Sequence, residues 1–166
     1  MNRPILIEAL QAGNQSGTGT YAARLIAELA ALAREQALPP LHATWPAEIP
    51  TPEETGETVT WWRLPVRRSP ARRAMLTAVA VPAIAMRIGA GLVHYTTGAG
   101  PLCRLPGGIC AVATIHDIAF LHDPAWQSRI RCAYLRATVS RAARVADRIF
   151  TDSAPAAADI IKRLDI

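Results

Sequence analysis

Short apolar runs alternate along this chain with segments whose apolar residues recur at helical spacing. The runs lie at 5–7, about 41–45, 59–64, 92–95, about 110–115 and 148–151, and their β-branched residues are typical of buried parallel strands. The helical segments span 21 to about 36, 69 to about 88, about 128 to 146, and 152 to the C-terminal end. The alternation predicts an α/β fold, a Rossmann-like open, mostly parallel sheet with helices on both faces. We expect Pro82 to bend the second helix, and Gly89 and Gly91 to end it.

Composition fits a single globular domain covering residues 1–166. The chain is 51% hydrophobic and 19% charged, which excludes a disordered or fibrous protein. Its three cysteines form no C-x-x-C pair, which favours a reducing compartment. No signal peptide is evident, and the longest uncharged apolar run, Ala74 to Met86, is shorter than the ~20 residues that span a membrane. We therefore expect a cytoplasmic protein.

The net charge of +5 is concentrated in one stretch. From Thr58 to His116 there is no Asp or Glu, and seven arginines occur: Arg63, Arg67, Arg68, Arg72, Arg73, Arg87 and Arg104. Guanidinium groups pair with phosphates and carboxylates in a bidentate geometry. The stretch therefore fits a phosphorylated substrate, an anionic membrane surface or nucleic acid, and also a basic loop with no partner beyond water.

Three segments are expected at the carboxyl ends of strands, where open α/β sheets bind their ligands. They are the turn Ser16-Gly17-Thr18-Gly19, the Gly- and Pro-rich loop after Tyr95, and the pair His116-Asp117. Because the strands are parallel, these segments meet at one edge of the sheet. This convergence predicts a binding site there.

The glycine turn precedes a predicted helix. Gly17 and Gly19 would let a ligand approach the backbone, and Thr18 could cap the helix, whose N-terminus favours an anion. The segment matches the dinucleotide pattern G-x-G-x-x-A, but more residues separate it from the strand than in the nucleotide fingerprint, and no acid clearly ends the second strand. A helix start without a ligand remains the alternative.

His116-Asp117 directly follows an apolar strand. An imidazole there can donate to a sugar hydroxyl, stabilise developing charge or move a proton near neutral pH; an ordinary loop pair is the alternative. The doublet recurs as His122-Asp123, which suggests a metal site. In known metal sites built on a His-Asp pair the pair lies in a helix, however, whereas here a strand runs directly into the first pair. His42 and His94 are expected to be structural, and Ser153 to cap the last helix.

Several of these segments resemble the N-terminal domain of family-4 (group 1) glycosyltransferases. The resemblance is carried by Gln15-Ser-Gly-Thr-Gly-Thr-Tyr21, by Leu92-Val-His-Tyr95, by Val112-Ala-Thr-Ile-His-Asp-Ile-Ala-Phe-Leu-His-Asp-Pro-Ala-Trp126, and by Arg144-Val-Ala-Asp-Arg-Ile-Phe-Thr-Asp-Ser153 with the helix after it. It covers nearly the whole chain in the right order, whereas residues 39–90 are not diagnostic.

The resemblance implies one half of a GT-B enzyme, which moves a sugar from a nucleotide-sugar to a glycan or lipid-linked acceptor with retention of configuration. The partner half, a C-terminal donor-binding domain, is absent from this sequence, so we expect no activity from the chain alone. The resemblance implies no metal or other cofactor. His116 would contact the donor sugar, and Gly17 and Gly19 the donor phosphates or the acceptor; the remaining expected substrate-binding residues are Thr18, Tyr95, Asp117 and Ser153.

The resemblance also gives the basic stretch a role at the inner face of a membrane. Arg63, Arg67, Arg68, Arg72 and Arg73, followed by an apolar helix, would suit an anionic bilayer surface. Two other functions stay open: a domain of an oxidoreductase that binds NAD(P) or a flavin, and a nucleic-acid-binding module. The last is disfavoured, since the chain shows neither a helix-turn-helix pattern nor strands with interleaved aromatic residues. The sequence names neither the sugar nor the acceptor.

Overall fold

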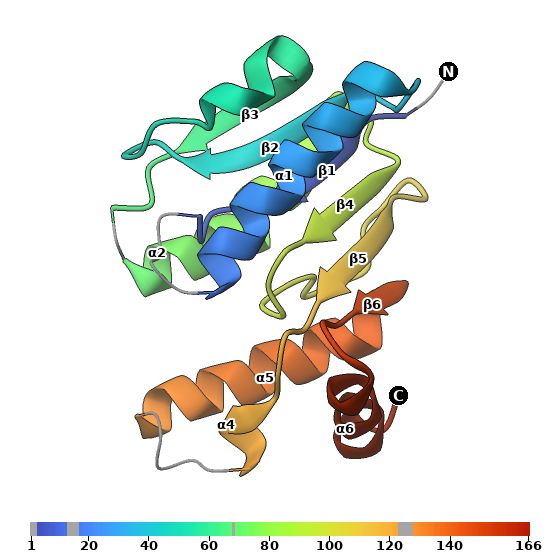
Figure 1. Cartoon of the computed structure of the whole chain (residues 1–166). Coiled ribbons are helices and arrows are strands. Elements are labelled where there is room, and N and C mark those ends of the chain that lie inside the picture. The colour runs from blue at the N-terminus through green and yellow to red at the C-terminus, as the bar shows by residue number, and fades with distance from the viewer. Residues whose placement is uncertain (1–2, 13–16, 68, 123–127) are drawn as a thin grey trace.

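The computed structural model describes residues 3–12, 17–67, 69–122 and 128–166 (Figure 1). Six strands form one sheet: β1 (Ile5–Glu8), β2 (Leu41–Pro46), β3 (Val59–Leu64), β4 (Leu92–Tyr95), β5 (Cys110–Thr114) and β6 (Arg148–Phe150). All neighbouring strands are parallel, in the order β3-β2-β1-β4-β5-β6. The predicted Rossmann-like α/β fold is confirmed, and the strand order reverses between β1 and β4.

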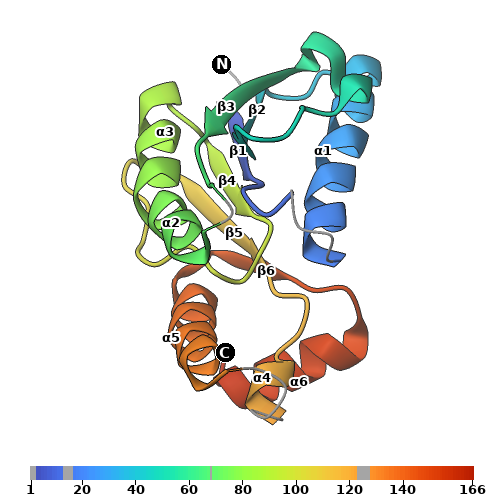
Figure 2. The same cartoon turned by 90° about the vertical axis from the view of Figure 1, so that its left-hand side faces the viewer.

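Helices cover both faces of this sheet. They are α1 (Gly17–Glu35), η1 (Glu53–Thr58), α2 (Pro70–Met75), η2 (Leu76–Ala80), α3 (Val81–Ile88), α4 (Ala119–His122), α5 (Arg129–Val145) and α6 (Ala154–Leu164). The helix α1 lies over one face and the α2–α3 segment over the other, while α4, α5 and α6 gather beyond the β5–β6 end (Figure 2). Among the described helices, none is long and apolar enough to cross a membrane.

The core is divided by the sheet, because successive side chains of a strand point to opposite faces. In β1, Ile7 packs with Ala22, Ile26 and Ala30 of α1. Its neighbour Leu6 packs in a separate cluster with residues of α3 and β4. The alanines of α1 let the helix approach the sheet closely. A third cluster joins the end of β5 to α5 and α6.

The segment between β3 and β4 is helical, as predicted, but its distortion precedes Pro82. Ser69 caps α2 by accepting a hydrogen bond from the Arg72 N–H, and Gly89, with φ 64°, ends α3 in the left-handed conformation. The distortion lies in the wide π turn of η2, before Pro82. Pro82 has no N–H to donate and clashes with the preceding turn in an ordinary helix, and widening that turn removes the conflict.

Other local expectations need correction. The helix α1 begins at Gly17, so Gly17, Thr18 and Gly19 lie in its first turn, and Thr18 does not occupy the capping position. The short helices η1 and α4 fall in segments for which no helix was predicted. Ser16, Arg68 and Asp123, all named in the sequence analysis, lie outside the described residues.

Candidate functional site

The carboxyl ends of β1, β4, β5 and β6 meet beside the first turn of α1. Glu8 ends β1 and pairs in register with Tyr95 at the end of β4. The residues that leave the neighbouring strands are Thr96, Ile115-His116 and Thr151-Asp152. This edge includes the point between β1 and β4 where the strand order reverses, which is the usual ligand site of such sheets.

His116 is held from two sides at this edge. Its Nδ1 atom lies 2.8 Å from Asp152 Oδ2, and its Nε2 atom lies 3.1 Å from the Thr96 carbonyl oxygen. The His116 side chain is 16% exposed, and that of Asp152 is 54% exposed. The imidazole is thus fixed in orientation while part of it remains open to solvent.

Tyr21 joins the first turns of α1 to His116. The two rings meet edge to face, with centroids 4.8 Å apart and an interplanar angle of 81°. The Tyr21 hydroxyl lies 3.1 Å from Thr114 Oγ1 at the end of β5. Since Tyr21 lies one helical turn after Gly17, the structure brings the predicted glycine segment and His116 to the same edge.

A buried histidine supports this arrangement from behind. His94 Nε2 lies 2.8 Å from the same Thr114 Oγ1, and the His94 ring contacts Phe150 edge to face. Burial lowers the pKa of His94 to about 4, so its ring is neutral at pH 7. His42 accepts a hydrogen bond from the Trp62 indole N–H. Both histidines are structural, as expected from the sequence.

Three of the other predicted site residues also lie at this edge, in different roles. Among the described residues, a Cβ atom added to Gly17 would meet no atom within 4 Å, so their packing does not require glycine there. Asp117 Oδ1 accepts the Ala119 N–H at the start of α4. Ser153 caps α6 by accepting the Ala156 N–H, as predicted. Asp152, the residue before this cap, turns its carboxylate to His116.

Tyr95 does not fit its predicted contact with substrate. Its side chain is only 1% exposed, and burial raises the pKa of its phenol. A Cβ atom added to Gly100 would come within 2.5 Å of the ring. The loop after β4 therefore closes over Tyr95, which is a core residue in this structure.

Glu8 is a buried acid that the sequence analysis did not select. It is 1% exposed, and its Oε1 accepts hydrogen bonds from the Leu10 N–H and the Thr77 hydroxyl. Burial raises the pKa of this carboxyl, and hydrogen bonding and Arg73 oppose that effect only in part. Its Oε2 has no hydrogen-bond partner among the described residues.

Unpartnered buried polar atoms gather at this edge. In the described part of the chain, the three buried side-chain nitrogen or oxygen atoms without a partner are Glu8 Oε2, Arg72 Nε and Thr151 Oγ1. Glu8 and Thr151 stand at the ends of β1 and β6, and Arg72 lies in the short helix that follows β3. Such atoms are rare and costly in native proteins, and water or a ligand bound along this edge would supply the missing partners.

His122, the first residue of the second doublet, lies in a surface cluster. His122 Nε2 lies 2.5 Å from Asp159 Oδ2, while Arg163 donates to both Asp159 Oδ1 and His122 Nδ1. These contacts attach α4 to α6. Within the described ranges, no group of three or more His, Cys, Asp or Glu side chains is placed to hold a metal ion. The absence of a metal requirement stays a prediction.

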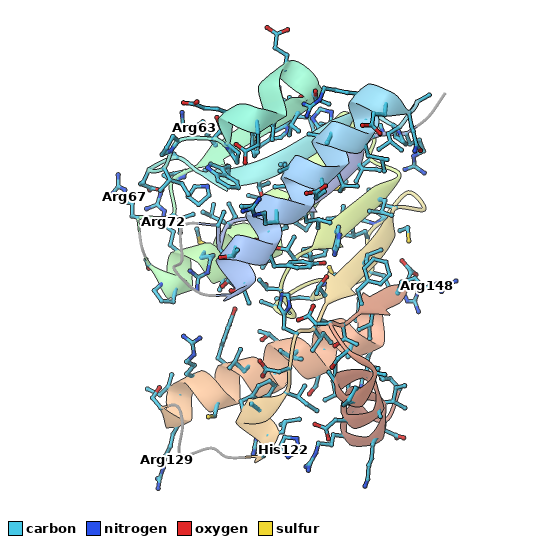
Figure 3. All side chains as sticks on the ribbon, in the orientation of Figure 1. Arg63, Arg67, Arg72, His122, Arg129 and Arg148 are labelled. Carbon is cyan, nitrogen blue, oxygen red and sulfur yellow. The ribbon has the colours of Figure 1, made fainter. Side chains whose placement is uncertain are left out.

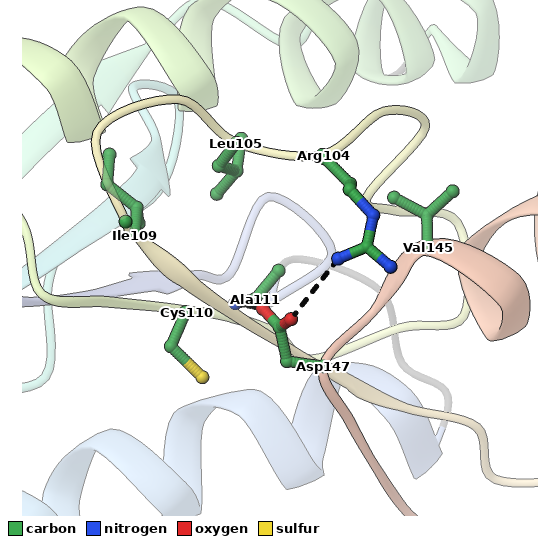
Figure 4. Close-up of a pocket in the computed structure, with 8 residues that line it drawn as sticks. Arg104, Leu105, Ile109, Cys110, Ala111, Val145 and Asp147 are labelled. Atoms are coloured by element: carbon green, nitrogen blue, oxygen red, sulfur yellow. Dashed lines mark hydrogen bonds and ion pairs between the residues drawn. The ribbon is translucent and has the colours of Figure 1, made fainter.

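A pocket of about 300 Å³ lies at the opposite edge of the sheet, where β5 and β6 begin (Figure 4). Arg104 and Asp147 face each other across it at 3.8 Å. The Asp147 carboxylate also accepts the Ala111 N–H, which joins the start of β6 to β5. This pocket is separate from the His116 edge.

The predicted basic stretch reaches the carboxyl edge on the β3 side. Arg63, Arg67 and Arg72 lie together there, away from Arg148 (Figure 3). Arg63 donates to the carbonyl oxygens of Ala47 and Ile49, whereas Arg67 is exposed. The outer side of the helical segment behind them carries exposed apolar residues, which are Met75, Val79, Ala83 and Met86. We call these four residues the apolar stripe.

Sequence signals are weak for the site residues that were not predicted. Glu8 is a lone acid at the end of an apolar strand, and Tyr21 follows a glycine turn at helical spacing. Thr96 contributes a backbone carbonyl, for which the residue type carries no signal. Asp152 and His116 are 36 positions apart, and only the register of β5 and β6 brings them together.

Comparison with known proteins gives one family. A family model described as a glycosyl transferase 4-like domain matches residues 16–165, nearly the whole chain. No curated protein shows significant sequence similarity to it.

Burial of Glu8 predicts a pH-dependent effect on stability. Its pKa is raised in the folded protein, so the unfolded chain ionises first as pH rises above about 4.5, and folding loses stability from there upward. Glu8→Gln removes this loss. We expect the free energy of unfolding of the variant, measured by urea titration, to increase relative to wild type between pH 4.5 and pH 7.5. Exposed Glu28→Gln on α1 is the control; parallel curves for wild type and Glu8→Gln would contradict the burial effect.

Proposed function

The chain belongs to the glycosyl transferase 4-like family, and we propose that it forms the acceptor-side half of a retaining, GT-B type glycosyltransferase. The proposed reaction moves a hexose from a nucleotide-sugar to a glycan or lipid-linked acceptor. The observation that carries this proposal is the contact between α1 and His116: the Tyr21 and His116 rings meet 4.8 Å apart, one helical turn after Gly17. A phosphate-binding helix terminus and an imidazole thus face one ligand edge.

The first turn of α1 and His116 have different roles in the proposed site. The first turn of α1 contains no acidic residue, so its N–H groups and its helix dipole favour the diphosphate of the donor. His116 contacts the donor sugar near the reacting carbon. A hydrogen-bond donor there lowers the energy of the negative charge that develops on the leaving diphosphate. In this proposal these groups take the place of a metal ion.

A second domain is required by this mechanism. Donor and acceptor react only when both are held in contact, and proximity and orientation supply much of the reduction in the barrier. We propose that a C-terminal donor-binding domain faces the carboxyl edge of the sheet, with His116 at the boundary between the two.

The oxidoreductase alternative has less support. Gly17 lies nine residues after Glu8, the end of β1, whereas the dinucleotide fingerprint places its first glycine almost directly after the strand. Glu48, the nearest acid after β2, accepts the Arg67 N–H at 2.7 Å and is therefore engaged in a loop contact. No observation favours a nucleic-acid-binding function.

We further propose that the apolar stripe rests on an anionic lipid surface. Met75, Val79 and Met86 are 56%, 65% and 52% exposed, while Val81 and Ala85 of the same segment are buried against the sheet. Arg87 lies over the Trp62 ring beside the stripe, and Arg72 and Arg73 precede it. Apolar residues flanked by arginines suit the headgroup region of a bilayer, where a lipid-linked acceptor would be presented.

His116→Ala tests the proposed enzyme. In the protein made from the complete reading frame, we expect turnover of the accepted nucleotide-sugar to fall about 10²-fold, because a donor to the developing charge is lost. The measurement is nucleotide release from a panel of UDP- and GDP-sugars, with circular dichroism to verify the fold and His42→Ala as a control. Activity close to wild type would make His116 a structural residue, and no activity of the wild type with any sugar donor would argue against the function.

Gly17→Val tests the first turn of α1. The added Cβ atom meets no atom of the described residues within 4 Å, so we expect the free energy of unfolding to stay within about 0.5 kcal/mol of wild type. Affinity for the nucleotide-sugar should fall about tenfold or more if the ligand approaches the backbone there. Titration calorimetry on the same protein measures this, and unchanged affinity would place the ligand elsewhere.

Vesicle binding tests the lipid surface. We expect the chain to sediment with vesicles containing anionic phosphatidylglycerol at low salt, and less at high salt. Met75→Asp should weaken this binding, while Ile161→Asp on α6, equally exposed on a distant helix, should not. Failure of the wild type to bind anionic vesicles at low salt would overturn the proposal.

A further inference from the structure

Both ring nitrogens of His116 face oxygen atoms that can only accept hydrogen bonds. Asp152 contributes a carboxylate oxygen 2.8 Å from Nδ1, and Thr96 contributes a backbone carbonyl oxygen 3.1 Å from Nε2. A neutral imidazole carries one N–H and one lone pair, so it satisfies only one of these contacts. The doubly protonated ring, which donates from both nitrogens, satisfies both.

His122 provides an internal comparison in the same structure. It also has an aspartate at one nitrogen, since Nε2 faces Asp159 Oδ2. Its other nitrogen, Nδ1, faces Arg163 Nη2 at 3.0 Å. A guanidinium only donates, so Nδ1 of His122 must accept in the arrangement seen. The two His–Asp pairs therefore differ in what their third partners require of the ring: an acceptor at His122 and a donor at His116.

We infer that Asp152 is a positioning residue that holds His116 as an imidazolium with its Nε2–H directed across the ligand edge. The carboxylate stabilises the ring charge and fixes the ring plane. Asp152 is half-exposed and His116 less so, hence the pair is open to solvent and to a ligand. That the ligand is a sugar donor rests on the proposed function; the charge and orientation of the ring do not.

The other groups around the ring are compatible with this charge. From α1, Tyr21 places its ring against the imidazole and directs its hydroxyl to Thr114. From the loop after β5, the Asp117 carboxylate accepts the Ala119 N–H. Among the described residues, Asp152 is the one whose side chain forms an ion pair with His116.

The held imidazolium specifies what His116 offers to a ligand. Its Nε2–H is shared with a neutral carbonyl in this structure, and an electron-rich ligand oxygen placed beside Thr96 would receive a stronger, charge-assisted hydrogen bond. Such an oxygen is a sugar hydroxyl, a phosphate oxygen or the oxygen of a leaving diphosphate. Asp152 acts through His116 and does not touch the ligand.

The test is nitrogen NMR of the chain labelled with ¹⁵N-histidine, with His116 assigned through His116→Ala. At about pH 6.5, the ordinary midpoint of histidine, we expect both His116 nitrogens to show protonated shifts in the wild type. In Asp152→Asn, the ratio of doubly protonated to neutral ring should fall about tenfold. Asp152→Glu, which keeps the carboxylate, should restore part of the signal.

Asp159→Asn is the matched control. It removes the carboxylate from His122 and should change the His122 nitrogen shifts while leaving those of His116 unaltered. Amide spectra of all variants verify folding. Because the Asp152 side chain is half-exposed, we expect its substitution to leave the fold intact. A neutral His116 in the wild type, or equal protonation in wild type and Asp152→Asn, would overturn the inference.

A kinetic experiment separates this inference from the proposed function. In the complete enzyme, Asp152→Asn should lower kcat more than it raises KM and should shift the pH–rate profile, whereas Asp159→Asn, the same change at the His122 pair, should leave the profile unchanged. If no nucleotide-sugar is turned over, the proposed function fails while the NMR result still decides the role of Asp152. Active enzyme with an identical pH profile in Asp152→Asn would contradict the positioning role.

Discussion

All six strands run in one direction, and this constraint gathers the residues of the candidate site. Glu8, Thr96, His116 and Asp152 follow four different strands and are far apart in the sequence. Parallel pairing in register places the ends of those strands at one edge, beside the N-terminus of α1. Because the ladder of backbone hydrogen bonds fixes this register, the edge is assembled as soon as the sheet forms. The site therefore depends on long-range pairing more than on any local segment.

This dependence explains what could be predicted from the sequence. The apolar run before His116 and the caps Ser69 and Ser153 are local signals, and the structure confirms the elements that they define. Asp152 and Ser153 both suit a helix cap, so local preference could not show that only Ser153 caps α6. The burial of Glu8 had no local signal either, because acids are mostly exposed. The π turn before Pro82 arises from a clash that residue spacing alone does not locate.

The polar groups behind the edge limit its flexibility. His94 is kept neutral by burial and meets Thr114, and Thr114 also meets the Tyr21 hydroxyl. Tyr21 in turn packs against His116. The contacts thus form a continuous series from His94 on β4, through Thr114 on β5 and Tyr21 on α1, to the His116 imidazole. A buried network of this kind favours one orientation of His116, which a group that donates to a ligand requires.

The His116-Asp117 doublet shows that adjacent residues in the sequence need not be partners in the structure. Asp117 caps α4, and His116 pairs instead with Asp152. His122, the last residue of α4, pairs with Asp159. The two histidines thus attach the end of β5 and α4 to the segment that contains α6. At the surface this contact serves only to join two helices. At the edge of the sheet it also sets the charge of a ring that faces the ligand region, so one kind of contact supports the fold in one place and the chemistry in the other.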